Sequence, residues 1–222
     1  ATPLVEGLLR LGDNALILSQ RLSAWCGHGP AIEEDMALTN TALDLLGQTR
    51  MWFSLAGQLE GAGRDEDALA YLRDAHHFRN VLLVERPDVD YAYTMVRQFF
   101  FDVWHYFLLE RLTQSSNADI AGIAAKSLKE VAYHVRRSSD MVVRLGDGTD
   151  ESHKRMQEAV DALWPYVGEM FVDDAIDQFF ADERPRRIMD QNDFALAFRE
   201  RFESGHHGVL TRGAPCYRFA QF

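Results

Sequence analysis

Polar and ionisable residues recur at helical spacing inside three otherwise apolar segments of this sequence. They are Asn40, Asp44 and Gln48, then Gln98, Asp102 and His105, and finally Lys126, Glu130 and His134. Residues three, four, seven or eight positions apart share one face of an α-helix. A buried polar group without a partner costs about 1–3 kcal/mol, so we expect the three stripes to meet inside a helical bundle.

The residues beside these stripes are large and apolar, which predicts that they belong to the core. They are Leu43, Leu46, Met51, Phe99, Phe101, Trp104, Leu128, Val131 and Val135. Lys126 is predicted to face the same interior and to supply a cation to its carboxylates.

Carboxylates and histidines inside a helical bundle are the ligands of di-iron proteins. Such a centre takes a Glu from each of two helices and a Glu-x-x-His pair from each of the other two. The only Glu-x-x-His here is Glu203 with His206, in a segment without helical periodicity, and Asp44 is followed three residues later by Gly47. The ligand set is therefore incomplete.

We interpret five residues as the remnant of such a centre, holding one another by hydrogen bonds in place of metal. They are Asp44, Asp102, His105, Glu130 and His134. No catalytic, cofactor-binding or metal-binding role is predicted for them. Two alternatives remain open at this point: metal binding by a reduced ligand set, and ordinary exposure if the helical phases are wrong.

The prolines leave room for long helices, because residues 31–86 and 88–164 contain none. Periodicity and capping residues predict helices over about 3–25, from Pro30 to near Gly61, one or two within 65–84, then 89–113, 118–145 and 150–180. No alternating strand pattern is present. The predicted fold is all-α, with four long helices forming a bundle and the rest packed around it.

Composition describes a globular domain, with 47% hydrophobic and 26% charged residues. The net charge of −11 argues against nucleic acid or an anionic membrane as the main partner. No apolar run approaches the roughly 20 residues of a membrane span. The first residues lack the features of a signal peptide, and two distant cysteines, Cys26 and Cys216, suit a reducing compartment. We therefore expect a cytoplasmic protein, with Cys26 buried as a small hydrophobe.

Several motifs carry a resemblance to a known family. They are Leu11-Gly12-Asp13-Asn14, Trp25-Cys26-Gly27-His28, Leu43-Asp44-Leu45-Leu46-Gly47-Gln48, Asp102-x-Trp104-His105, Lys129-Glu130-x-x-Tyr133-His134 and Arg144-Leu145-Gly146-Asp147-Gly148-Thr149. From about residue 8 to 178 the chain resembles the PaaC family of phenylacetate-degradation proteins, a ferritin-like subunit of phenylacetyl-CoA ring epoxidase. After about 178 the family's Gly-Lys-x-Gly-x-His-Thr-Glu stretch is not recognisable.

The resemblance implies a non-catalytic structural subunit of a multicomponent di-iron monooxygenase. Its implied partners are a homologous di-iron catalytic subunit and other epoxidase subunits, with no cofactor in this chain. The alternative from another class is a di-metal oxidase or oxygenase active on its own, using Asp102, His105, Glu130 and His134 as ligands. A stand-alone ferritin-like binding protein is a weaker third possibility.

Charge divides the chain into two predicted units. Residues 1–183, the predicted ferritin-like domain, carry an excess of acidic side chains, whereas residues 184–222 are basic and irregular. The two histidine pairs, His76-His77 and His206-His207, are predicted to be exposed.

Overall fold

The computed structural model describes residues 2–172 and 174–176, a part of the chain that contains seven α-helices and no β-strand. The helices are α1 (Pro3–Ser23), α2 (Ile32–Glu60), α3 (Glu66–Tyr71), α4 (Leu82–Glu85), α5 (Tyr91–Leu112), α6 (Ala118–Gly146) and α7 (Asp150–Leu163). Three 3-10 turns accompany them: η1 (Ala75–His77), η2 (Trp164–Tyr166) and η3 (Gly168–Phe171). The all-α prediction is confirmed.

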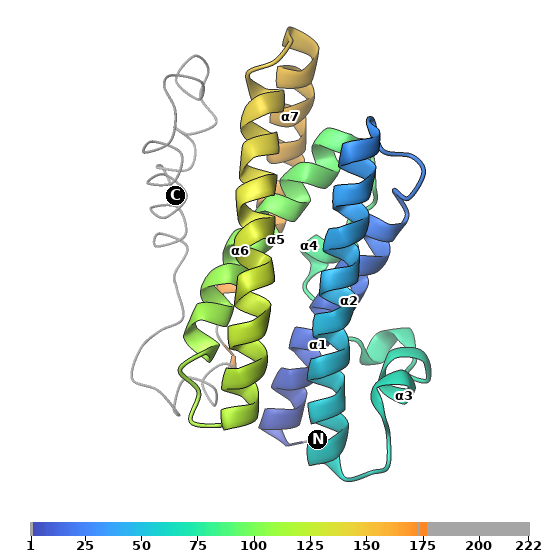
Figure 1. Ribbon diagram of the computed structural model, residues 1–222, viewed down its shortest axis with the longest axis vertical. Coiled ribbons are helices and arrows are strands. Elements are labelled where there is room, and N and C mark those ends of the chain that lie inside the picture. The colour runs from blue at the N-terminus through green and yellow to red at the C-terminus, as the bar shows by residue number, and fades with distance from the viewer. Residues whose placement is uncertain (1, 173, 177–222) are drawn as a thin grey trace.

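The four long helices pack as two hairpins, α1 with α2 and α5 with α6. In Figure 1, α2 and α6 run side by side at the front, while α1 and α5 lie behind them. The shorter helices cover the outside, with α3 against α2, α4 against α1 and α5, and α7 against α5 and α6. This is the predicted ferritin-like bundle with additional helices around it.

Local capping residues set most helix boundaries. The side chains of Thr2, Asp65, Asp90 and Asn117 each accept a hydrogen bond from a backbone N–H in the first turn of the following helix. The end of α2 is fixed by Gly61, whose φ of 67° lies in the left-handed region that glycine tolerates. These ends fall within a few residues of the predicted ones.

The predicted helix over 150–180 was too long. Helix α7 ends at Leu163, and the chain continues as the short turns η2 and η3. Pro165 is the physical reason, because proline has no N–H for the helical hydrogen-bond ladder and its ring clashes with the preceding turn.

Helix α5 is buried along most of its length and on most of its sides. Its three consecutive phenylalanines, Phe99, Phe100 and Phe101, are at most 2% exposed, as predicted for core residues. A helix that is apolar all round needs neighbours on several sides, which α4, α6 and α7 provide. Polar groups on α5 are therefore forced into the interior.

The prediction that Leu43 and Leu46 belong to the core was wrong, since they are 60% and 45% exposed. Helix α2 carries apolar residues on two faces, and the buried one contains Leu38, Leu45 and Trp52. Hydrophobic content alone does not tell which of two apolar faces meets the core. The leucines beside the polar stripe therefore point to solvent.

Cys26 was predicted to be buried but is exposed. Helix α1 ends at Ser23, and the turn that follows sends Trp25 inward, where its indole N–H donates to the hydroxyl of Thr94 at 2.9 Å. Cys26 is thereby left on the outside of the turn.

None of the described helices is both long enough and apolar enough to cross a membrane. The predicted segment 184–222, with its second histidine pair and the Glu203–His206 match, lies outside the described residues.

Candidate functional site

The carboxylate of Asp102 on α5 lies at the centre of the candidate site. It is fully buried and accepts hydrogen bonds from Gln98 Nε2 at 2.6 Å and from the Ser138 hydroxyl on α6 at 2.8 Å. Gln98 lies one helical turn before Asp102, as the sequence spacing predicted. Both carboxylate oxygens therefore already have a partner from this chain.

Two polar contacts join α2 to α6 beside Asp102. The Nε2 atom of His134 lies 2.9 Å from Asp44 Oδ2, and Gln48 Nε2 donates to Glu130 Oε2 at 2.9 Å. His134 is buried, whereas the side chain of Asp44 is 36% exposed. The site is thus a polar seam that runs from the bundle interior to its surface between α2 and α6.

His105 lies in the same interior but makes no hydrogen bond among the described residues. Its Nδ1 atom is buried without a partner. Burial, and then the nearby His134, lowers the pKa of His105 to about 3, so the ring is neutral at physiological pH. Burial raises the pKa of Asp102 to about 6, although His134 and the bond from Ser138 oppose the rise.

Two members of the predicted stripes lie elsewhere. Asn40 and Lys126 are both exposed, so Lys126 does not supply the interior cation that was predicted. On α6, the buried positions next to it are Ser127 and Val131, and Lys126 projects about 100° away from Ser127. The interactions with other helices that lower the pKa of Asp102 come from His134, Ser138 and Arg137.

Helix α1 contributes no carboxylate to this seam. Its buried Asp13 is ion-paired with Arg73 in the segment between α3 and η1, and also accepts the backbone N–H of Arg79 at 2.8 Å. Asp13 is therefore engaged by the outer turn. A di-metal centre would need a ligand from this fourth helix.

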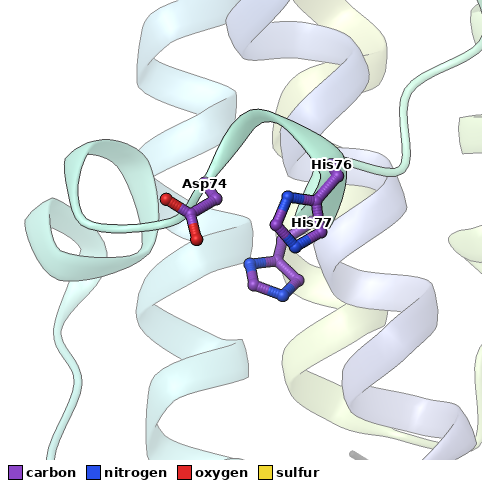
Figure 2. Close-up of side chains that lie close together, drawn as sticks. All are labelled: Asp74, His76 and His77. Carbon is purple, nitrogen blue, oxygen red and sulfur yellow. The ribbon is translucent and has the colours of Figure 1, made fainter.

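The residues present do not fit a di-iron centre. Asp102 accepts hydrogen bonds from Gln98 and Ser138. Glu130 accepts one from Gln48, and Asp44 contacts His134. Gly47 stands where a histidine ligand would be needed. Among the described residues, the only three metal-ligating groups whose donor atoms approach within 4.8 Å are Asp74, His76 and His77, which lie on the surface (Figure 2). Residues 2–172 and 174–176 therefore offer no ligand set that matches the di-metal centre of such bundles.

Four polar residues of this arrangement were not predicted from the sequence. Ser138 binds Asp102, while Glu34 on α2 accepts hydrogen bonds from Arg137 and from the Tyr91 hydroxyl. Ser138 lies four residues after His134 on α6, so extending the predicted stripe by one turn would have found it. The contacts of Glu34 join α2, α5 and α6, and no spacing within one helix could have predicted them.

Asp102 and His105 are expected to act in opposite directions on the pH dependence of folding. Because the pKa of Asp102 is raised from 3.8 to about 6, its contribution to stability falls as the pH rises from about 4 to 6. Because the pKa of His105 is lowered from 6.5 to about 3, its contribution rises with pH across about 3 to 6.5. The two contributions offset each other between about pH 4 and 6.

The variant Asp102→Asn removes the contribution of Asp102 to the pH dependence of stability and leaves that of His105. We expect it to lose stability relative to the wild type as the pH falls from about 6.5 to 4, by on the order of 3 kcal/mol, because the proton uptake of unfolded His105 is then unopposed. Urea unfolding in steps across this range measures the effect, and His105→Gln should shift in the opposite sense. A pH profile of Asp102→Asn parallel to that of the wild type would contradict the assignment.

Comparison with known proteins gives two matches. The sequence model of the family described as phenylacetic acid catabolic protein matches residues 1–204. The chain is also 50% identical over 175 residues to one of the subunits of the 1,2-phenylacetyl-CoA epoxidase of Escherichia coli strain K12. That alignment covers 79% of this chain and 70% of the relative.

Proposed function

Because this chain belongs to the phenylacetic acid catabolic protein family, we propose that it is the structural, non-catalytic subunit of a phenylacetyl-CoA epoxidase. Its relative in Escherichia coli is named as a subunit of that enzyme, which implies further subunits there. In this proposal the catalytic di-iron centre belongs to a homologous partner, and this chain supports the assembly in which phenylacetate is degraded.

The contacts of Asp102 are the observation that carries the non-catalytic role. Each oxygen of Asp102 accepts a hydrogen bond from a side chain of this chain, so the buried carboxylate has polar partners without an ion. Gln48 donates to one oxygen of Glu130, and His134 contacts one oxygen of Asp44. These contacts favour the structural subunit over an oxidase that is active on its own.

An exposed apolar face on α2 supports a role within a complex. Ile32, Met36, Leu43 and Leu46 are 45–72% exposed and recur at i, i+4, i+11 and i+14, which places them on one side of the helix. We call these four residues the α2 seam. Exposed apolar side chains in a continuous row are typical of a protein–protein interface.

Helix α6 adds a basic stripe made of Lys126, Lys129 and Arg136, with Tyr133 between them. All four residues are exposed, at spacings that share one face, and Arg136 lies over the Tyr133 ring at 5.7 Å. No ion pair involves either lysine among the described residues. In a chain of net charge −11, this stripe is suited to acidic groups on a partner.

We place the partner subunit against the α2 and α6 side of the bundle. An obligate interface of this kind buries well over about 2,000 Å², an area that requires long helices on both sides. Coexpression with the catalytic subunit tests the assembly, and a stable hetero-oligomer that epoxidises phenylacetyl-CoA is the expected product. Monomeric behaviour of this chain beside the coexpressed catalytic subunit would count against it.

Iron analysis tests the non-catalytic part of the proposal separately. The isolated chain, loaded with Fe(II) and desalted, is expected to hold no stoichiometric iron, because Gly47 and the occupied carboxylates leave the ligand set incomplete. The complex with the catalytic subunit is expected to hold iron under the same treatment. Two ions per isolated chain with the spectrum of a carboxylate-bridged pair would reject the structural assignment.

A further inference from the structure

The turn between α3 and α4 brings one carboxylate and two imidazoles together on the protein surface. Asp74, His76 and His77 each offer a donor atom that lies within 4.8 Å of the other two, and all three residues are exposed. The centroids of the two imidazole rings are 4.0 Å apart. Figure 2 shows the carboxylate and both rings on one side of the turn. Although the histidines are adjacent in sequence, the tight 3-10 turn η1 lets their rings approach each other.

These three side chains are not engaged elsewhere in the described part of the chain. Asp74 occupies the N-cap position of η1, yet its carboxylate makes no capping hydrogen bond. Neither imidazole has a hydrogen-bond partner among these residues. By contrast, the exposed His28 and His153 each place Nδ1 within 3.1 Å of a backbone carbonyl. The donors on η1 are therefore available to an external ligand.

The turn that carries the donors is anchored at both ends. Arg73, just before Asp74, is ion-paired with buried Asp13, and its guanidinium lies 4.3 Å from the centroid of the Phe78 ring. Arg79, just after the turn, donates its backbone N–H to the same Asp13. Binding at η1 thus requires little ordering of the backbone, which lowers its entropic cost.

The charge around the turn also permits a cation. The two flanking guanidiniums are neutralised, Arg73 by Asp13 and Arg79 by Glu6 at 2.9 Å. The free carboxylate of Asp74 then provides the local negative charge.

We propose that Asp74, His76 and His77 form a surface site for a divalent transition metal of the zinc class, with water completing the coordination. Zinc binds imidazole nitrogen and carboxylate oxygen at about 2.0–2.2 Å, which sets tetrahedral donors roughly 3.4 Å apart. Exposed side chains reach that spacing from the observed separation by small torsional changes. Two nitrogen donors and one oxygen donor favour Zn²⁺ or Cu²⁺ over Fe²⁺ and Mn²⁺. The site lies outside the polar seam and does not depend on the proposed function.

Isothermal titration calorimetry of the tag-free chain with Zn²⁺ alone tests this site. We expect one Zn²⁺ per chain, with binding that weakens as the pH falls, because only neutral imidazole is a ligand. The double variant His76→Gln with His77→Gln is expected to bind at least about tenfold more weakly, a loss of about 1.4 kcal/mol. Asp74→Asn should also weaken binding, since it removes the third ligand's charge.

Two matched double variants serve as controls. His28→Gln with His153→Gln removes two exposed histidines elsewhere, and His206→Gln with His207→Gln removes the other adjacent pair. Both should retain the wild-type affinity. Wild-type zinc affinity in the variant without His76 and His77, or a loss of binding only with the second adjacent pair, would overturn the proposal, as would unchanged affinity in Asp74→Asn.

Discussion

Replacing Leu43 and Leu46 with glutamate is expected to abolish association with the proposed catalytic subunit while this chain stays folded. Both side chains belong to the α2 seam and are largely exposed in the isolated chain, so the charges are solvated there. In the complex the same carboxylates would be buried without partners. Central apolar anchors of interfaces contribute about 2 kcal/mol or more when truncated, so the double variant should bind at least about a hundredfold more weakly.

Association is measured by co-purification from coexpressing cells. Folding is measured by a melting curve of the isolated variant. Leu72→Glu is the matched control, because Leu72 is 81% exposed but lies just after α3, away from the seam. It should assemble normally. Full assembly by the Leu43→Glu, Leu46→Glu variant would show that the partner binds elsewhere.

The substitution Asp13→Ala is expected to cause the largest loss of stability, about 3–5 kcal/mol. Asp13 is fully buried, and the side chain of Arg73 is 5% exposed, so removing the carboxylate leaves a buried guanidinium without its counter-charge. The backbone N–H of Arg79 loses its acceptor at the same time. The segment between α3 and α4 should therefore detach from α1 before the bundle unfolds.

Urea unfolding at neutral pH measures this loss, and Arg50→Ala provides the comparison. Arg50 also forms an ion pair, with Glu66 at 3.1 Å, but its side chain is 76% exposed. Exposed pairs contribute about 0–1 kcal/mol, so little change is expected. Similar losses for the two variants would mean that burial of the Asp13 pair has no energetic consequence.

The helices themselves were predictable from the sequence because their signals are local. Asp65, Asn117 and Gly61 act within a few residues of the boundary that each one sets. Asp74 stands at the corresponding position before η1, but its carboxylate does not cap this turn. A capping residue indicates a possible start, and the backbone of the turn decides whether the side chain is used.

The candidate site was predictable in part. The spacing of Gln98 and Asp102 correctly placed them on one face of α5, where they bind each other. It did not reveal that Glu130 is bound by Gln48, a residue 82 positions away, nor that Ser138 binds Asp102. Partners on different helices depend on how those helices are rotated and shifted against each other.

The sequence by itself determined that the described part of the chain is helical and where most of its helices begin and end. Tertiary structure decided which apolar face of α2 is buried, so that Leu43 and Leu46 face solvent, and which partner each carboxylate receives. It also brought His76 and His77 together with Asp74. The physical reason is that spacing fixes which residues share a face, whereas the packing of neighbouring helices fixes where that face points.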